Sequence, residues 1–142
     1  MEYILVASLI LIVFIPATFI FMNNIRKSTD ELAESKLTRI GNDLVNTAYE
    51  VYYQGSPAKI SLKINMPDKV LDMYVLKNWS IPANQLVIVL SKGDSNNTLV
   101  FDSEVNINGS FSTESFSKGA KDAVITANRS AGGILYSNIK II

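Results

Sequence analysis

The feature that most constrains this chain is an uncharged, almost wholly apolar run near its start, from Tyr3 to Met22. At about 1.5 Å of rise per residue, such a run can cross a hydrocarbon layer of roughly 30 Å as an α-helix. Its apolar surface must be covered by lipid or by protein. The run alone leaves three interpretations open: a signal peptide, a membrane anchor, or the core of an assembly of many copies.

The charges around the run argue against a cleaved signal peptide, which carries basic residues ahead of its apolar region. Here the acid Glu2 precedes the run, and the first bases, Arg26 and Lys27, follow it. By the positive-inside rule, this order alone would keep the following domain in the cytoplasm. We expect instead that a basic leader once preceded residue 1 and has been removed, so that the domain lies outside the cell.

An amphipathic pattern follows the run and predicts one long helix over residues 1–54. Apolar side chains recur every three to five positions, as expected for one helical stripe: Leu32, Leu37, Ile40, Leu44, Ala48 and Val51. We expect residues 1–25 to form an apolar assembly or membrane segment. Residues 26–54 are expected to be amphipathic and to pack on the sheet that follows.

Three positions are expected to modify this helix. Pro16 predicts a bend, because its ring cannot take the hydrogen-bond geometry of an unbroken helix. Gly41 lowers the local helix propensity by roughly 1 kcal/mol relative to alanine. Gly55, followed by Ser56 and Pro57, predicts the helix end.

Beyond Pro57 the apolar period changes from that of a helix to that of strands. Strands are predicted over 59–64, 70–76, 85–90, 98–101, 123–127 and 134–142, with a hairpin turn in 91–97 and loops with short strands in 103–119. Six or seven short strands at turn spacing favour a sandwich. We therefore expect an α+β fold, with the long helix followed by a small antiparallel, immunoglobulin-like β-sandwich over residues 58–142.

Composition excludes several classes of function. The 142 residues include 13 basic and 13 acidic side chains, so no basic surface for nucleic acid is expected. With no cysteine and no histidine, the chain lacks thiolate nucleophiles, imidazole catalysis and most zinc ligands. No phosphate-binding or nucleophile motif is found in the sequence. We therefore predict that the protein is not an enzyme and uses no cofactor or metal.

The apolar run itself holds the candidate assembly residues. Large side chains are mixed with small ones along it, which would let neighbouring helices interlock. The candidate residues are Tyr3, Ala7, Ser8, Phe14, Pro16 and Phe19. Glu2 has two interpretations. In the first, the acid lies in solvent or lipid headgroups, where a negative charge suits the N-terminus of a helix. In the second, the acid is buried and a group of a neighbouring subunit neutralises it, because an unpaired buried carboxylate costs several kcal/mol.

Four Asn-x-Ser/Thr triplets make candidate sites for N-linked glycans. Their acceptor residues all lie in the sheet region, in or near predicted turns: Asn78, Asn96, Asn108 and Asn128. A chain this rich in asparagine and serine produces about two such triplets by chance. Glycosylation of at least one is expected if the protein is exported.

This organisation resembles archaeal type IV pilins, particularly those whose precursors carry a class III signal peptide. The residues that carry the resemblance are the start Met1-Glu2-Tyr3-Ile4-Leu5-Val6, the uncharged run to Met22, the amphipathic continuation to Tyr53, and a sheet domain with Asn-rich turns. The acid that the family carries early in its mature helix corresponds to Glu2 here. The similarity in architecture covers the whole chain, whereas the specific motif is confined to about the first twenty residues.

The resemblance implies a leader removed by a prepilin peptidase, subunits held in the membrane before assembly, and an assembly ATPase with its platform. It also implies a homopolymeric extracellular filament whose core is bundled N-terminal helices, serving adhesion or surface contact. The alternative is a membrane-anchored minor pilin, or an archaellum accessory or stator-like surface protein, with a β-sandwich binding domain.

Overall fold

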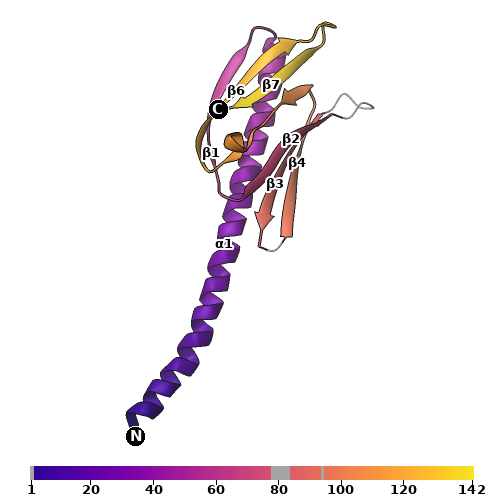
Figure 1. Ribbon diagram of the computed structural model, residues 1–142. Coiled ribbons are helices and arrows are strands. Elements are labelled where there is room, and N and C mark those ends of the chain that lie inside the picture. The colour runs from indigo at the N-terminus through magenta and orange to yellow at the C-terminus, as the bar shows by residue number, and fades with distance from the viewer. Residues whose placement is uncertain (1, 78–83, 94) are drawn as a thin grey trace. The chain divides into compact units, whose positions relative to one another are not determined.

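A computed structural model describes residues 2–77, 84–93 and 95–142 (Figure 1). The chain divides into two compact units, Met1–Leu32 and Ala33–Ile142. The helix α1 (Glu2–Gln54) begins in the first unit and ends in the second. The predicted division into domains 1–54 and 58–142 stays a prediction.

The long N-terminal helix predicted from the sequence is confirmed. α1 continues through both Pro16 and Gly41. It ends at Gly55, whose φ of 77° is a left-handed conformation that glycine adopts without strain. The Gly55 N–H donates to the carbonyls of Val51 at 3.2 Å and Tyr52 at 3.1 Å, which closes the last turn. The bend at Pro16 stays a prediction.

The described part of the second unit continues with strands and one short helix. In chain order they are β1 (Lys59–Met66), β2 (Val70–Lys77), β3 (Asn84–Lys92), β4 (Ser95–Ser103), β5 (Ile107–Gly109), α2 (Thr113–Phe116), β6 (Gly119–Arg129) and β7 (Leu135–Ile141). The predicted hairpin is confirmed, since β3 pairs with β4 down to Lys92 opposite Ser95. Its turn is tighter than predicted because residues 95–97 already belong to β4.

The strands form two sheets, a four-stranded one in the order β1-β6-β7-β5 and a three-stranded one in the order β2-β3-β4. All pairs are antiparallel except β5 with β7, which is parallel. The prediction of a wholly antiparallel sheet region is therefore wrong at β5. A long helix with two mostly antiparallel sheets is an α+β fold, as predicted. The two sheets do not close on each other.

The core of the second unit is built from one face of α1 and the inner faces of both sheets. The predicted stripe is buried from Leu37 onward, and Leu37, Leu44 and Val51 are fully inaccessible. It joins β-strand residues such as Ile88 and Ile125 in one cluster. The helix therefore acts as a structural layer of this unit and is packed over more than four turns.

At its first position the predicted stripe is wrong. Leu32 is 62% exposed, whereas its neighbour Ala33 is buried. A helical step of four residues links Ala33 to Leu37, while Leu32 stands about 100° away around the helix. Apolar spacings of three to five residues fit a stripe that begins at either Leu32 or Ala33. The packing against the sheets decides which of the two is buried.

Gly41 lies against the ring of Phe101 on β4. A Cβ atom built on Gly41 would stand 2.3 Å from Phe101 Cε2, closer than carbon atoms approach in proteins. Gly41 is itself buried, and Phe101 is 9% exposed. The glycine that looks like a weak point of the helix thus makes room for an aromatic side chain of the three-stranded sheet.

Polar contacts fix α1 to both sheets. Glu34 binds the β3–β4 hairpin through both carboxylate oxygens, with Lys92 Nζ at 2.8 Å from Oε2 and Asn97 Nδ2 at 3.1 Å from Oε1. On the other sheet, the fully buried Ser137 hydroxyl of β7 donates to the Ala48 carbonyl at 2.6 Å. These contacts set the height of the helix along each sheet.

Replacing Ser137 with alanine should lower the free energy of unfolding by about 1–2 kcal/mol, because a buried hydrogen bond is lost without any gain in packing. Chemical denaturation of the full chain in detergent, followed by circular dichroism, measures the change. Ser61→Ala, at an exposed position on β1, is the matched control and should change the stability by less than about 0.5 kcal/mol. Equal stability of the two variants would contradict a contribution from the Ser137 bond.

Candidate functional site

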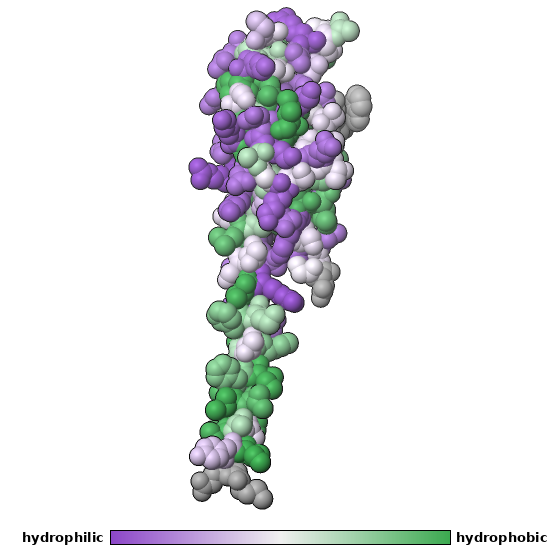
Figure 2. All heavy atoms as spheres, turned by 60° about the vertical axis from the view of Figure 1, so that its left-hand side comes forward, coloured by the Kyte–Doolittle hydropathy of each residue, from purple (hydrophilic) through white to green (hydrophobic). Residues whose placement is uncertain are grey.

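The apolar segment at the N-terminus is the first candidate site. Every residue from Tyr3 to Met22 is exposed, with Tyr3 at 89% and Phe19 at 69%. Figure 2 shows hydrophobic residues covering this part of α1, whereas the sheet region is largely hydrophilic. By length and composition, the described helix is able to cross a membrane. Monomeric soluble proteins rarely expose so large a continuous apolar surface, so the segment needs a partner.

The serine and threonine hydroxyl groups within this segment are satisfied by the helix itself. Ser8 Oγ donates to the Leu5 carbonyl at 2.9 Å, and Thr18 Oγ1 donates to the Phe14 carbonyl at 2.7 Å. Such bonds let serine and threonine sit in an apolar environment without a desolvated donor. The segment can therefore be buried in lipid or among other helices without leaving these polar groups unpaired.

Two of the predicted assembly residues border the same hollow. Phe14 and Phe19 line a shallow apolar groove of about 310 Å³ together with Ile15, Thr18 and Met22. The groove has the shape that a side chain of a neighbouring helix would fill. One of the lining residues is Thr18, and small residues of this kind let neighbouring helices approach closely.

The other predicted assembly residues lie elsewhere along the segment. Tyr3, Ala7, Ser8 and Pro16 are exposed on α1, and none of them lines the groove. Glu2 is the first residue of α1, and its side chain lies outside the described part of the structure. The roles of these residues in assembly stay predictions.

Three tyrosines near the end of α1 form an aromatic group that the sequence interpretation missed. The ring centroids of Tyr49 and Tyr53 are 4.6 Å apart, and those of Tyr52 and Tyr53 are 5.6 Å apart. A hydrogen bond with Tyr49 raises the pKa of the Tyr53 hydroxyl above its ordinary value. The i,i+4 spacing of Tyr49 and Tyr53 on the helix would have revealed the first pair.

Three carboxylates in the sheet region have local partners. Asp68 Oδ2 lies 3.8 Å from Lys118 Nζ, Asp72 Oδ1 accepts the N–H of Met73 at 2.8 Å, and Asp102 Oδ1 accepts from Gln85 Nε2 at 2.6 Å. Within the described residues, no group of three or more aspartate, glutamate, histidine or cysteine side chains could hold a metal ion.

The candidate glycan acceptors differ in their surroundings. Asn96 is exposed on β4, whereas Asn108 on β5 and Asn128 on β6 are half-buried. Asn128 Nδ2 is 3.4 Å from Thr126 Oγ1, a weak contact on its own strand. Asn78 lies outside the described residues. All four assignments stay predictions.

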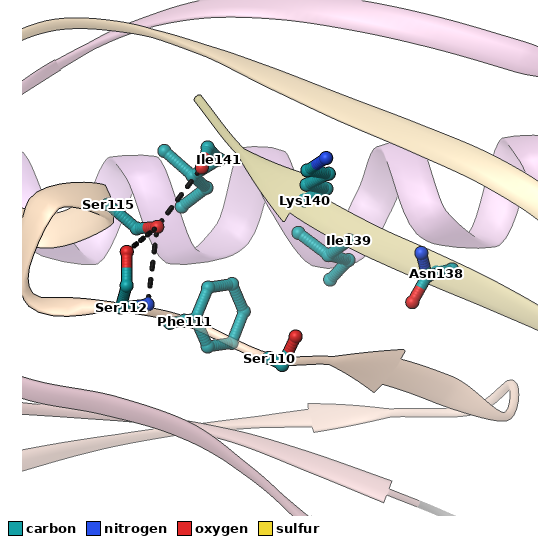
Figure 3. A pocket seen from close by; sticks show the side chains of 8 residues that line it. All are labelled: Ser110, Phe111, Ser112, Ser115, Asn138, Ile139, Lys140 and Ile141. Atoms are coloured by element: carbon teal, nitrogen blue, oxygen red, sulfur yellow. Dashed lines mark hydrogen bonds between the residues drawn. The ribbon is translucent and has the colours of Figure 1, made fainter.

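A cleft lies where the short strand β5 leaves the edge of β7 (Figure 3). β7 runs on to Ile141, whereas β5 ends at Gly109 and the chain turns into α2. The opening has a volume of about 400 Å³. It is lined by Ser110, Phe111, Ser112, Ser115, Asn138, Ile139, Lys140 and Ile141.

One end of the cleft is closed by serine hydrogen bonds. Ser115 Oγ donates to the Ile141 carbonyl at 3.0 Å and accepts the Ser112 N–H at 3.3 Å. The Phe111 ring folds back over Gly109, where a Cβ atom would stand 2.8 Å from the ring. The residues that line the cleft thus include one aromatic residue, Phe111, and two polar residues of β7, Asn138 and Lys140. The sequence interpretation missed it because β5 and α2 fall in a Ser-rich stretch without clear periodicity.

Comparison of the chain with models of known protein families, with curated proteins and with solved structures found no match. The apolar segment of α1 and the cleft beside β7 are therefore interpreted from their own chemistry.

Proposed function

We propose that the chain is the structural subunit of an extracellular filament of the archaeal type IV pilus kind, assembled through bundled N-terminal helices. The observation that carries the proposal is the exposed apolar surface from Tyr3 to Met22, next to a unit that completes its own core without it. Adhesion or surface contact is the proposed role. Bundling with copies of itself would cover the segment. Burial of its apolar area stabilises by roughly 25 cal/mol per Å² relative to exposure to water.

The proposal includes the partners that the resemblance implies. Before assembly the subunit would be held in the membrane through α1, and a prepilin peptidase would have removed its leader. Because lipid already keeps the segment dry, moving it into a filament requires work, which an assembly ATPase and its platform would supply. We also propose that the sheet region is an immunoglobulin-like sandwich. The division of the strands into sheets of four and three supports this proposal.

The second candidate is a membrane-anchored surface protein, such as a minor pilin or an archaellum accessory part. It is favoured by the same helix, which is long and apolar enough to cross a membrane alone. Electron microscopy of filaments sheared from the cell surface, with mass spectrometry of their protein, separates the two. Filaments composed of this chain support the pilin, whereas a chain found wholly in the membrane fraction as a monomer overturns it.

Replacing Glu2 with alanine should slow or abolish filament growth while the sheet unit stays folded. The reason is that a buried carboxylate would be neutralised by a neighbouring subunit, and its loss removes that pairing. Filament yield by microscopy and folding by circular dichroism measure the two effects. Glu31→Ala, an exposed acid later in α1, is the control. Wild-type yield from the Glu2 variant would mean that this acid stands in solvent or headgroups.

A further inference from the structure

The outer face of the three-stranded sheet carries apolar side chains that the core does not use. Tyr74, Val87 and Val100 lie opposite one another on β2, β3 and β4, so their side chains share one face of the sheet. The next pair along these strands, Met73 with Ile88, belongs to the core cluster and therefore marks the inner face. The row of Tyr74 lies on the other side, away from the core.

Val87 shows that these outer side chains cover one another. Only 1% of its surface is exposed, although it does not belong to the core cluster. Its neighbours Tyr74 and Val100 are exposed, Val100 at 50%. Leu76, two residues further along β2, adds an exposed apolar side chain to the same face. An apolar patch that includes a tyrosine is typical of the centre of a protein interface.

The charged side chains that share this face are acids. Asp72 lies opposite Val89, and Asp102 lies opposite Gln85, both in rows of the outer face. Both acids are exposed. In the described part of the three-stranded sheet, the outer face thus combines an apolar patch with two negative charges.

The outer face of the four-stranded sheet has the opposite charge. Ile125 and Ile139 are buried in the core, so the residues that alternate with them on β6 and β7, and their partners on β1, face outward. The exposed charged residues on this outer face are three bases and one acid, namely Lys59, Lys63, Lys140 and Asp122.

Small uncharged side chains lie among these bases. Ser61 on β1 is paired with Val124 on β6, and Val124 is paired in turn with Lys140 on β7. Ser61 is exposed and Val124 is half-buried. A face of this kind has room for an apolar patch between its bases, and the bases can meet acids beside that patch.

We propose that the outer face of the three-stranded sheet docks on the outer face of the four-stranded sheet of a second copy of this chain. The complementary charge of the two faces indicates this occupant and sets the orientation, while burial of the apolar patch supplies the affinity. The inference rests on the proposed function, because the filament would hold the copies side by side.

The proposed contact joins two different surfaces. Each copy would use one outer face for the copy before it and the other outer face for the copy after it. Contacts of this heterologous kind continue as an open helical series unless the rotation closes them into a ring. The sheet units would therefore add a second set of contacts along the filament, separate from the bundled helices.

The chain contains no cysteine, so introduced thiols test the contact directly. Val100→Cys places a thiol on the first face, and Ser61→Cys places one on the second face. Intact cells that make the full chain with both substitutions are treated with a short thiol-reactive cross-linker. We expect dimers, trimers and longer multimers on a denaturing gel, because each copy has one thiol for each of its two neighbours.

Two controls accompany this experiment. Each single-thiol chain should stay monomeric, because its thiols do not meet in a heterologous contact. A chain with Ala131→Cys and Ser61→Cys should also stay monomeric, because Ala131 lies exposed in the turn between β6 and β7 and outside both faces. Dimers from Val100→Cys alone would indicate a two-fold contact of that face with itself and would overturn the inference.

Charge reversal tests whether the two faces recognise each other. In the double-thiol chain, Asp72→Lys with Asp102→Lys should reduce the multimers about tenfold, because like charges then meet across the contact. Lys59→Glu with Lys63→Glu should have the same effect. All four substitutions together restore opposite charges and should recover most of the multimers. Circular dichroism checks that each variant is folded, and a failure of the fourfold variant to recover would contradict the charge pairing.

The outcomes are separable from those of the filament proposal. Filaments of this chain without multimers from the double-thiol variant overturn the inference and leave the proposed function standing. Multimers that respond to charge reversal in cells without filaments support the inference and overturn the filament. Multimers that are insensitive to both charge reversals overturn the docking of these two faces.

Discussion

Gly41→Ala is expected to lower the free energy of unfolding of the second unit by about 2–3 kcal/mol, even though alanine is the better helix former. The added Cβ would stand 2.3 Å from Phe101 Cε2 and 2.6 Å from Cε1, so it meets the flat side of the ring. Phe101 is 9% exposed and belongs to the core cluster, so the ring cannot turn away into solvent. Either β4 or α1 must shift.

Chemical denaturation of the full chain in detergent, followed by circular dichroism, measures this loss. Asn42→Ala, at the exposed neighbouring position on α1, is the matched control. It should change stability by at most about 0.5 kcal/mol and favour the helix slightly. In the Gly41→Ala background, Phe101→Leu should recover part of the loss, because the smaller side chain leaves room for the methyl group. A Gly41→Ala protein as stable as the wild type would show that the ring and the helix are not in close contact.

Gly41 also illustrates how far the sequence could predict the fold. Local rules identified the helix, its end at Gly55 and the change to strands after Pro57, because capping chemistry and periodicity act over a few residues. The same rules interpreted Gly41 as a defect. Its actual role depends on a ring 60 positions later in the chain, and no local pattern encodes that contact.

The strand pairing shows a similar limit. Alternation predicted β1 and the β3–β4 hairpin, since neighbouring strands pair through a short turn. The parallel pairing of β5 with β7 joins segments that are far apart in the sequence, and a strand of three residues carries almost no periodic signal. The cleft exists because of this pairing, so it could not be predicted, although the Asn108 triplet beside it could.

The candidate assembly segment was the easiest feature to predict and the hardest to interpret. Its apolar character follows from composition alone, and its exposure in the structure is what an almost wholly apolar run of 20 residues implies. The structure adds a groove that Phe14 and Phe19 line together with Thr18, which lies between them in the sequence. Whether lipid or other helices cover the segment depends on the partner. An experiment that distinguishes lipid from other helices is therefore needed.

Phe19→Lys should provide that distinction, by lowering filament yield about a hundredfold while leaving the subunit in the membrane. Phe19 is exposed at 69% and lies close to the end of the apolar run, with Arg26 further along the same helix. In a bilayer, a lysine near the end of a helix extends its ammonium group to the headgroups, so the insertion cost is small. In a helix bundle, the same group would lie among apolar side chains of neighbouring helices, where an unpaired buried charge costs several kcal/mol.

Cell fractionation with immunoblotting measures the membrane-held chain, and electron microscopy of sheared material measures the filaments. Phe19→Leu is the matched control, because it keeps the segment apolar and should retain most of the yield. Phe14→Lys, five residues further into the run, should lose filaments and also reduce membrane insertion, since its ammonium group is too deep to reach the headgroups without distortion. Filaments at wild-type yield from Phe19→Lys would place this face of α1 outside any bundle. At the depth of residue 19, a membrane tolerates a lysine and a helix bundle does not. The two lysine variants therefore distinguish a membrane anchor from an assembly segment. They do so even where the wild-type chain is found both in the membrane and in filaments.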